Sequence, residues 1–197
     1  MIKNKTLVFL VLLLETKTIY MRNLFIIIVA IMLMHNSYAQ KNNSAASKPL
    51  KFSAGLEAAL PIGNFAKRAT YGIGGTVQVD YNVAKKLDLT FNTGYINFTG
   101  NTQKIAGLGS YKFPTQSFIP LIAGIKYHFS ENVFGAAQLG ATVVSFKGGG
   151  SSTDFTLSPG VGYKFSDKID ALIKYTGYTG GGYGLSNTIG LRLGYTF

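Results

Sequence analysis

The sequence predicts an all-β protein: an eight-stranded antiparallel up-and-down transmembrane β-barrel preceded by an N-terminal signal segment. The most direct observation is a repeated five-residue pattern of an aliphatic residue, any residue, Tyr, any residue and a bulky apolar residue. Its four copies end at Val83, Phe129, Phe165 and Phe197, and a short turn and a new alternating run follow the first three. This is the pattern of a repeated hairpin. Regular polar and apolar alternation, and connections that are alternately short and long, agree with it.

Residues 1–39 are expected to form a signal peptide region. Arg22 precedes eleven consecutive apolar residues, and Ser37 and Ala39 are small residues at the two positions that a signal peptidase reads. The apolar run falls short of the roughly 20 residues of a membrane-spanning helix. Met21 is the expected start of translation. The alternatives are an unusually long signal that includes the residues before Met21, or an anchor of two short helices. Polar residues 40–50 are expected to form a flexible lead.

The predicted barrel domain, residues 51–197, contains eight runs. In seven of them one face is almost wholly apolar and the other is polar or glycine; the run 133–144 is apolar on both faces, and its phase stays open. The other runs cover residues 52–60, 73–83, 87–95, 119–129, 155–165, 169–175 and 189–197. Every charged residue placed within a run falls on the polar face, which indicates a strongly specified strand register. These residues are Glu57, Asp80, Asp88, Lys126, Lys164, Asp170, Lys174 and Arg192.

The apolar face can turn inward, as in a soluble barrel or sandwich, or outward to lipid, as in a membrane barrel. Three features favour lipid. The runs have about the 9 to 11 residues that cross a bilayer at a tilt. The polar face carries four acids and four bases, which would neutralise one another in a lumen. The repeated tyrosines would lie at one level as an aromatic girdle at the membrane interface. They are Tyr81, Tyr127, Tyr163 and Tyr195.

The connections predict which end of the barrel faces outward. Three short turns alternate with longer connections rich in Gly, Ser and Asn. Because outer-membrane barrels have short periplasmic turns and longer external loops, both termini are expected on the periplasmic side. The longer connections are residues 61–70, 99–114, 147–154 and 178–187.

From about residue 51 to the end, the chain resembles the small outer-membrane β-barrel proteins of OmpX/OmpA type. The most specific segment is residues 191–197, which alternates apolar residues and ends in an aromatic residue, like the terminal strand of such proteins. The resemblance implies that the barrel assembly machinery reads this signal, with Tyr195 and Phe197 in that role. It also implies a place in the outer membrane of a gram-negative-type cell, in contact with outer-membrane lipid and lipopolysaccharide.

Three charged residues are predicted to form a cluster in the lumen: Glu57, Lys174 and Arg192. Each lies five residues from the turn-side end of its run, and closing the sheet brings the last strand beside the first. We expect a buried ion-pair plug there, although the shear of the barrel can shift the alignment by several residues. Since eight strands enclose only enough space for side chains, an open pore is not expected.

No catalytic, cofactor-binding or metal site is predicted, and the chain is not expected to be an enzyme. The chain has no Cys, and after signal cleavage His128 would be its only histidine. His128 lies beside a short turn, where pairing with Asp88 or with solvent is the ordinary expectation. The net charge of +11 is spread over loops and strands and forms no basic stripe, so nucleic acid is not an expected partner.

The function that these patterns favour is an integral outer-membrane barrel with a structural or surface-interaction role, a polar plugged lumen and loops facing outside. The alternative is a small passive channel for water, ions or small solutes; behind it come a lipid-modifying barrel enzyme and a secreted soluble barrel for an apolar ligand. The connection 99–114 is expected to be the longest loop. It offers Lys104, Tyr111 and Lys112 to anionic sugars or a partner protein, although an ordinary solvated loop fits it too.

Overall fold

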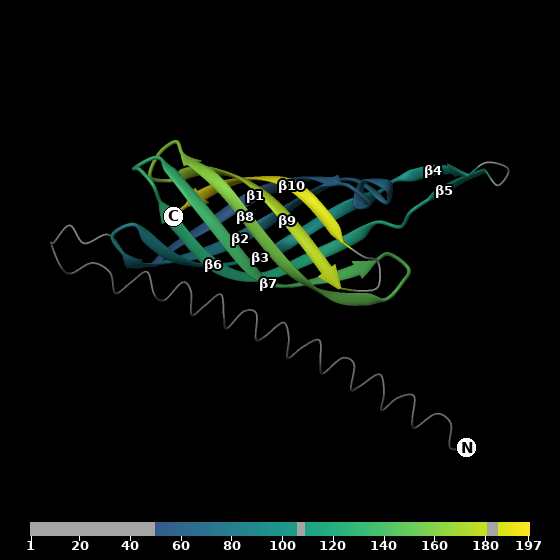
Figure 1. Ribbon diagram of the computed structural model, residues 1–197, viewed down its shortest axis with the longest axis horizontal. Helices are drawn as coiled ribbons and strands as arrows, with labels where there is room; N and C mark the ends of the chain where they lie inside the picture. Colours follow the sequence, from purple (N-terminus) through teal and green to yellow (C-terminus); the bar gives the residue numbers. More distant parts are fainter. Residues whose placement is uncertain (1–49, 106–108, 181–184) are drawn as a thin grey trace, which may run out of the picture. The chain divides into compact units, whose positions relative to one another are not determined.

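The computed structural model describes residues 50–105, 109–180 and 185–197. These residues form eight long strands, one short hairpin and one turn of 3₁₀ helix (Figure 1). The predicted signal peptide region 1–39, the expected start at Met21 and residues 40–49 of the predicted lead lie outside the described residues. The long strands are β1 (Leu50–Ile62), β2 (Ala69–Ala84), β3 (Leu87–Gly100), β6 (Gln116–His128), β7 (Val133–Phe146), β8 (Ser151–Lys164), β9 (Ile169–Gly180) and β10 (Ser186–Thr196).

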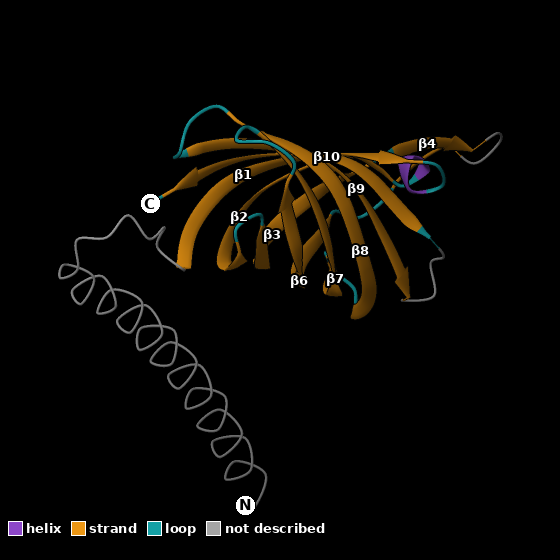
Figure 2. Cartoon of the chain, turned by 60° about the vertical axis from the view of Figure 1, so that its left-hand side comes forward, coloured by secondary structure: helices purple, strands orange, loops and turns teal. Residues whose placement is uncertain are grey.

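The eight strands close into one antiparallel barrel. Each strand pairs with the next barrel strand along the chain, and β1 completes the circle by pairing with β10, from Ser53 opposite Thr196 to Ile62 opposite Asn187. Figure 2 shows the strands wrapping around a single lumen. Because a closed sheet has no free edge, the main-chain polar groups of the strands can bond within the barrel, as a bilayer requires. The prediction of an eight-stranded up-and-down barrel is confirmed.

The two ends of the barrel differ in their connections. At one end, called the turn end here, short turns join β2 to β3, β6 to β7 and β8 to β9. The end of the chain lies there too, since the Phe197 amide donates to the Phe52 carbonyl and the Thr196 amide to the Lys168 carbonyl. The other end, called the loop end, carries the longer connections.

Two of the longer connections contain structure that the sequence did not predict. The connection 99–114 is not a simple loop: β3 continues to Gly100, and β4 (Thr102–Ile105) pairs with β5 (Gly109–Lys112) in a separate two-stranded sheet. This hairpin extends from the loop end in Figure 1. The connection 61–70 contains the 3₁₀ helix η2 (Phe65–Lys67). Short connections of this kind lack the long periodic pattern that reveals a barrel strand.

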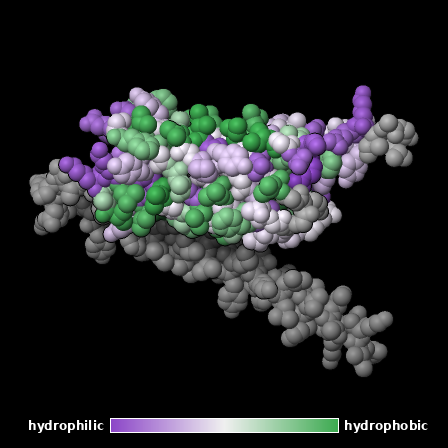
Figure 3. Space-filling view, in the orientation of Figure 1, coloured by the Kyte–Doolittle hydropathy of each residue, from purple (hydrophilic) through white to green (hydrophobic). Residues whose placement is uncertain are grey.

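The apolar face of the barrel points outward. Leu56, Ile73, Val161 and Ile173 are 61–73% exposed, whereas the inward Arg192 is 1% exposed. In Figure 3 apolar side chains gather over the strands and hydrophilic ones toward the two ends. An outward apolar band with a polar interior is the arrangement of a membrane barrel and the reverse of a soluble one. The expectation that the apolar face meets lipid is therefore confirmed, and the soluble alternative is wrong.

The open phase of the fifth run is settled by its neighbours. In β7 the even-numbered residues Phe134, Gln138 and Thr142 are buried, while Leu139 is 56% exposed. Pairing with β6 and β8 fixes this choice, because Gln138 lies opposite Gly124 on one side and Ser158 on the other. Within the part of the chain that the structure describes, no helix is long and apolar enough to cross a membrane.

The sequence predicted a lumen filled by polar groups, but the structure also places apolar side chains there. Two groups of apolar side chains lie inside it. The turn-end apolar cluster consists of Phe134, Ala136 and Leu172. The loop-end aromatic cluster consists of Ala59, Phe65, Ala69, Ile96, Phe98, Phe118, Val144 and Tyr178. The reason is geometric: an eight-stranded barrel must fill its interior with side chains, and these apolar groups occupy part of that space beside the charged ones.

Candidate functional site

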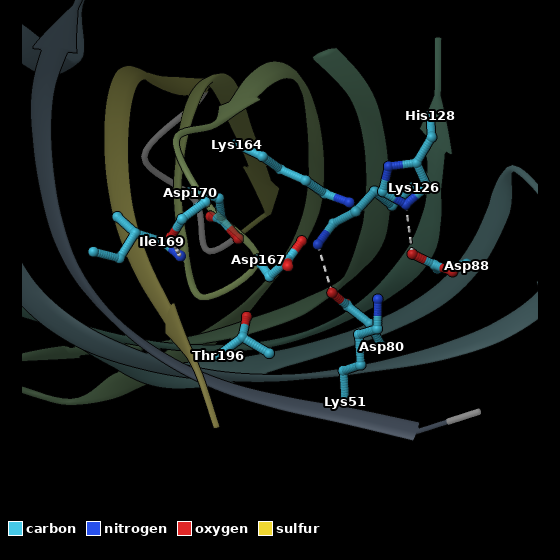
Figure 4. Close-up of a pocket in the computed structure, with 11 residues that line it drawn as sticks. Lys51, Asp80, Asp88, Lys126, His128, Lys164, Asp167, Ile169, Asp170 and Thr196 are labelled. Carbon is cyan, nitrogen blue, oxygen red and sulfur yellow. Dashed lines mark hydrogen bonds and ion pairs between the residues drawn. The ribbon is translucent and has the colours of Figure 1, made fainter. Parts of the chain in front are cut away.

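The mouth of the lumen at the turn end is lined by charged side chains from β1, β2, β3, β6, β8 and β9 (Figure 4). Lys126 Nζ lies 2.5 Å from Asp80 Oδ2, and Gln78 donates to the other oxygen of Asp80 at 2.7 Å. Lys164 extends into the same mouth. The charges thus come from strands that are far apart in sequence and that only closure of the barrel brings together.

His128 lies in this mouth and pairs with Asp88, as expected. The distance from His128 Nε2 to Asp88 Oδ2 is 2.7 Å, and Asn82 also donates to Asp88 at 2.7 Å. Ser166 lines the same pocket, which raises the question of a serine nucleophile. Its Oγ instead accepts hydrogen bonds from the amides of Lys168 and Ile169, as in a turn stabilised by a serine side chain. Among the described residues, no hydrogen bond joins His128 to Ser166.

Farther inside, Glu57 and Lys174 form a buried ion pair. They come from β1 and β9, which flank β10, and Lys174 Nζ lies 2.7 Å from Glu57 Oε1. The side chains of both residues are at most 6% exposed. Two of the three residues predicted to meet in the lumen are therefore in direct contact.

Arg192 departs from the predicted cluster. Its backbone lies opposite Glu57, but the guanidinium runs toward the turn end and contacts Asp170 at 3.6 Å. It also donates to Thr76 Oγ1 and Ser53 Oγ, both at 3.0 Å. The expected plug of three charges is thus two separate ion pairs.

Glycine determines this path for Arg192. A Cβ atom on Gly194 would lie 2.5 Å from Arg192 Nη1, and one on Gly55 would lie 2.8 Å from Arg192 Nε. The same relation recurs for Phe134, whose ring occupies the place of a side chain on Gly162. Inward glycines such as Gly55, Gly162 and Gly194, which leave room for large inward side chains, are the sequence signal for these positions.

A network of neutral side chains also crosses the lumen, and the sequence analysis missed it. Gln138 on β7 donates to Thr90 on β3 at 2.9 Å, and Thr142 and Thr156 share a hydrogen bond of 2.7 Å between β7 and β8. Polar residues at inward positions are the available signal. Their partners lie up to 60 positions away in the sequence, so strand periodicity does not identify them.

At the loop end the aromatic cluster lies inside the lumen. Phe65 of η2 is fully buried and its ring centroid lies 5.2 Å from that of Phe98 and 5.8 Å from that of Phe118. Tyr178 meets Phe118 edge to face at 4.9 Å. Phe98 and Phe118 have inward parity and were predictable on that ground, whereas nothing in the sequence pointed to insertion of a loop residue such as Phe65.

The repeated tyrosines lie on the outward face near the turn end. Tyr81, Tyr127, Tyr163 and Tyr195 are 43–48% exposed. The last three each meet, edge to face, the Phe two residues later, at centroid distances of 5.3–5.4 Å. Phe197, which ends the chain, is 77% exposed.

The loop end is uniformly basic. Lys67 and Arg68 lie in or beside η2, Lys104 and Lys112 on the β4–β5 hairpin, and Lys147 in the connection after β7. All but Arg68 are exposed, and the acid nearest this end, Asp154, is buried at 7% exposure. Within residues 50–105, 109–180 and 185–197, no group of three or more acids or histidines is arranged for a metal ion.

Several solved structures share this fold. The crystal structure of Ail, the attachment invasion locus protein of Yersinia pestis, is 14% identical, with a TM-score of 0.53 and coverage of 75% of this chain and 97% of that one. Ail in a phospholipid bilayer nanodisc is 15% identical, with a TM-score of 0.53 and coverage of 75% and 99%. Ail with the heparin analogue sucrose octasulfate is 15% identical, with a TM-score of 0.52 and coverage of 75% and 97%.

The fold is therefore that of the small outer-membrane β-barrels, and the predicted resemblance and outer-membrane location agree with it. No curated protein matches the sequence. A family model does: the one described as "Putative MetA-pathway of phenol degradation" matches residues 26–193. Because that match spans most of the sequence, the chain belongs to this family.

Proposed function

We propose that this chain is a non-enzymatic outer-membrane barrel with a closed lumen, whose loop end binds anionic polysaccharide at the cell surface. The observation that carries the proposal is the one-sided charge of the loop end. Four lysines are exposed there, at Lys67, Lys104, Lys112 and Lys147, while the nearest acid is buried. A surface with a single sign of charge attracts polyanions over roughly a Debye length, about 8 to 10 Å at ordinary salt.

A related barrel supports the choice of ligand. Ail of Yersinia pestis has been crystallised with sucrose octasulfate, a densely sulfated sugar and heparin analogue. At 15% identity the likeness concerns the fold alone. The proposed ligand therefore depends mainly on the positive charge of the loops of this chain.

The contents of the lumen support a structural role over transport and catalysis. The loop-end aromatic cluster lies at one end, the charged mouth and the turn-end apolar cluster lie at the other, and the Glu57–Lys174 pair and the hydrogen bonds of Gln138 lie between them. An interior packed in this way leaves no open water path. For catalysis, His128 would need a nucleophile, and the hydroxyl of Ser166 is taken up by its own turn.

The test compares two pairs of lysines at opposite ends of the barrel. Purified protein in detergent micelles is titrated with sucrose octasulfate at low and at physiological salt. K104Q/K112Q should weaken binding about tenfold at low salt, because two charge contacts between lysine and sulfate are removed. K85Q/K86Q, in the turn between β2 and β3, removes the same charge at the other end and should leave binding unchanged. Equal losses in the two variants would refute a loop-end site.

The remaining site residues keep the roles expected from the sequence. We propose that Tyr81, Tyr127, Tyr163 and Tyr195 anchor the turn end at the membrane interface, where amphipathic rings prefer to lie. Their outward position and half-exposed rings support this. Tyr195 and Phe197 are proposed as the signal for the barrel assembly machinery, with residues 1–39 as the export signal. The outward apolar face would contact outer-membrane lipid and lipopolysaccharide.

A second candidate function is the binding or passage of small aromatic solutes. The family description, which names a pathway of phenol degradation, favours it. The aromatic cluster at the loop end offers matching chemistry. Liposomes that carry the barrel and are challenged with benzenesulfonate, an aromatic anion that crosses a bare bilayer slowly, separate the two candidates: entry faster than in protein-free liposomes supports passage, and equal rates exclude it.

A further inference from the structure

We propose that the loop-end aromatic cluster is a binding site for a small aromatic molecule, and that Phe65 occupies this site in the free protein. The inference deepens the second candidate function, since it names a site and a gating residue. The inference concerns binding at the loop-end mouth, which is measured without a membrane. Binding can therefore fail while passage through the lumen succeeds, and passage can fail while binding succeeds.

The site has walls of its own. Phe98 and Phe118 project inward from β3 and β6, with centroids 4.7 Å apart, and Tyr178 from β9 meets Phe118 edge to face. Ala59 and Ala69 are the small residues beside them. Gly72, opposite Phe98 in the register, makes room for that ring, because a Cβ atom there would lie 2.5 Å from it. These contacts do not involve Phe65, so the walls can persist when its ring leaves.

The occupant, in contrast, belongs to a connection. Phe65 sits on the three-residue helix η2, and the preceding Asn64 makes no side-chain cap to it. Gly63 just before it has φ = +58°, a left-handed conformation that glycine adopts easily and that suits a hinge. A fully buried ring on so short an element is removable by a change of a few backbone angles.

The connection is held from outside the barrel wall. Asn101, at the base of the hairpin, donates its amide to the Arg68 carbonyl at 2.8 Å and its side chain to the Ala66 carbonyl at 3.0 Å. Gln103 donates to the Lys67 carbonyl at 3.1 Å. One further bond, from Arg68 to Ser186 Oγ at 3.0 Å, reaches β10. The hairpin therefore holds the segment that carries Phe65, and loosening this clamp should free the ring.

The chemistry of the site selects an aromatic ring over an aliphatic one. The Phe65 ring is tilted by 56° to that of Phe98 and stacked at 26° on that of Phe118, and the Arg68 guanidinium carbon lies 5.6 Å from its centroid. Pairing of aromatic rings and a cation over a ring face both require a π system. A ligand that exchanges with Phe65 would replace one phenyl ring with another and would restore the contacts of the walls.

The experiment uses phenol and cyclohexanol, which match in size and hydroxyl group and differ in the ring. Binding is titrated on the full barrel in detergent micelles. We expect wild type to bind phenol and F65A to bind it about tenfold more tightly, because the competing ring is absent and the site is always open. N101A should fall between them, since it only loosens the clamp. Cyclohexanol should bind more weakly than phenol in all three.

A fluorine label shows whether phenol displaces Phe65 in the unmodified loop. 4-Fluorophenylalanine at position 65 should shift its fluorine resonance toward the solvent-exposed value as phenol saturates the site. The same label at Phe134, in the turn-end apolar cluster, serves as the matched control and should not shift. The inference is overturned if F65A binds phenol no better than wild type, if cyclohexanol binds equally well, or if the label at position 65 stays unchanged at saturating phenol.

Discussion

The buried pair of Glu57 and Lys174 allows a sharp test of how the lumen stabilises the barrel. E57A removes the carboxylate and leaves the Lys174 ammonium, whose side chain is 6% exposed, without the partner that lies 2.7 Å away. Breaking a buried ion pair by removing one member costs about 3 to 5 kcal/mol, because the remaining charge is uncompensated. Replacing both members is much less harmful, since no charge stays behind.

The unfolding midpoint gives the expected magnitude. For a denaturant slope of about 3 kcal/mol per M, a loss of 3 to 5 kcal/mol lowers the urea midpoint by about 1 to 1.7 M. Reversible unfolding in detergent micelles is followed by far-ultraviolet circular dichroism, because the chain has no Trp for fluorescence. E57A/K174M, which has no charge at either position, should recover most of the loss.

The matched control uses the residue that the sequence had placed in the same cluster. E57A/R192A removes a positive charge, as E57A/K174M does, but Arg192 is paired with Asp170 instead of Glu57, so no recovery is expected. A wild-type midpoint for E57A would show that the pair contributes nothing. Recovery in E57A/R192A but not in E57A/K174M would show that the partners have been assigned wrongly.

Three further predictions concern packing, orientation and assembly. G162A should destabilise the barrel by about 1 to 3 kcal/mol in the same unfolding assay, since the added Cβ would lie 2.1 Å from the Phe134 ring. G162A/F134L should recover part of the loss, and an unchanged stability of G162A would contradict this packing. L56R should destabilise the folded barrel by about 2 to 4 kcal/mol for a position near the bilayer midplane. The loss is seen as a smaller folded fraction in lipid vesicles on a heat-modifiability gel, and a neutral effect would mean that the outward face does not meet lipid. F197A should slow assembly in cells several-fold, measured as the appearance of the folded band on a heat-modifiability gel over time. F165A, at the corresponding position of an internal repeat, should not slow assembly, and equal effects of the two substitutions would argue against a terminal signal.

Strand positions and faces were predictable because they depend on short-range periodicity. A period of two over ten or more residues assigns each side chain to a face, and seven of the eight runs had a clear phase. The run 133–144 lacked this information because it carries apolar residues on both faces. Its inward members, such as Phe134, became evident only through hydrogen bonding to both neighbouring strands.

The candidate sites were less accessible to sequence reasoning. Position along a run suggested that Glu57, Lys174 and Arg192 would meet, but a side chain as long as that of Arg192 reaches partners several residues away from its own register position. The inward glycines that make room for the Arg192 side chain can be identified in the sequence. The sequence does not show, however, which large side chain occupies the space beside each glycine. The insertion of Phe65 had no periodic signal at all, since it lies in a connection.

By itself, the sequence determined the number of barrel strands, the face on which each charged residue lies and the distinction between a turn end and a loop end. These properties follow from alternation and turn residues, which act over a few positions. Only the tertiary structure decided which lumenal groups touch, how the hairpin clamps the neighbouring connection and that the Phe65 ring inserts among the aromatic residues at the loop end. Those contacts depend on closure and stagger of the whole sheet, which bring together residues more than a hundred positions apart, such as Thr76 and Arg192.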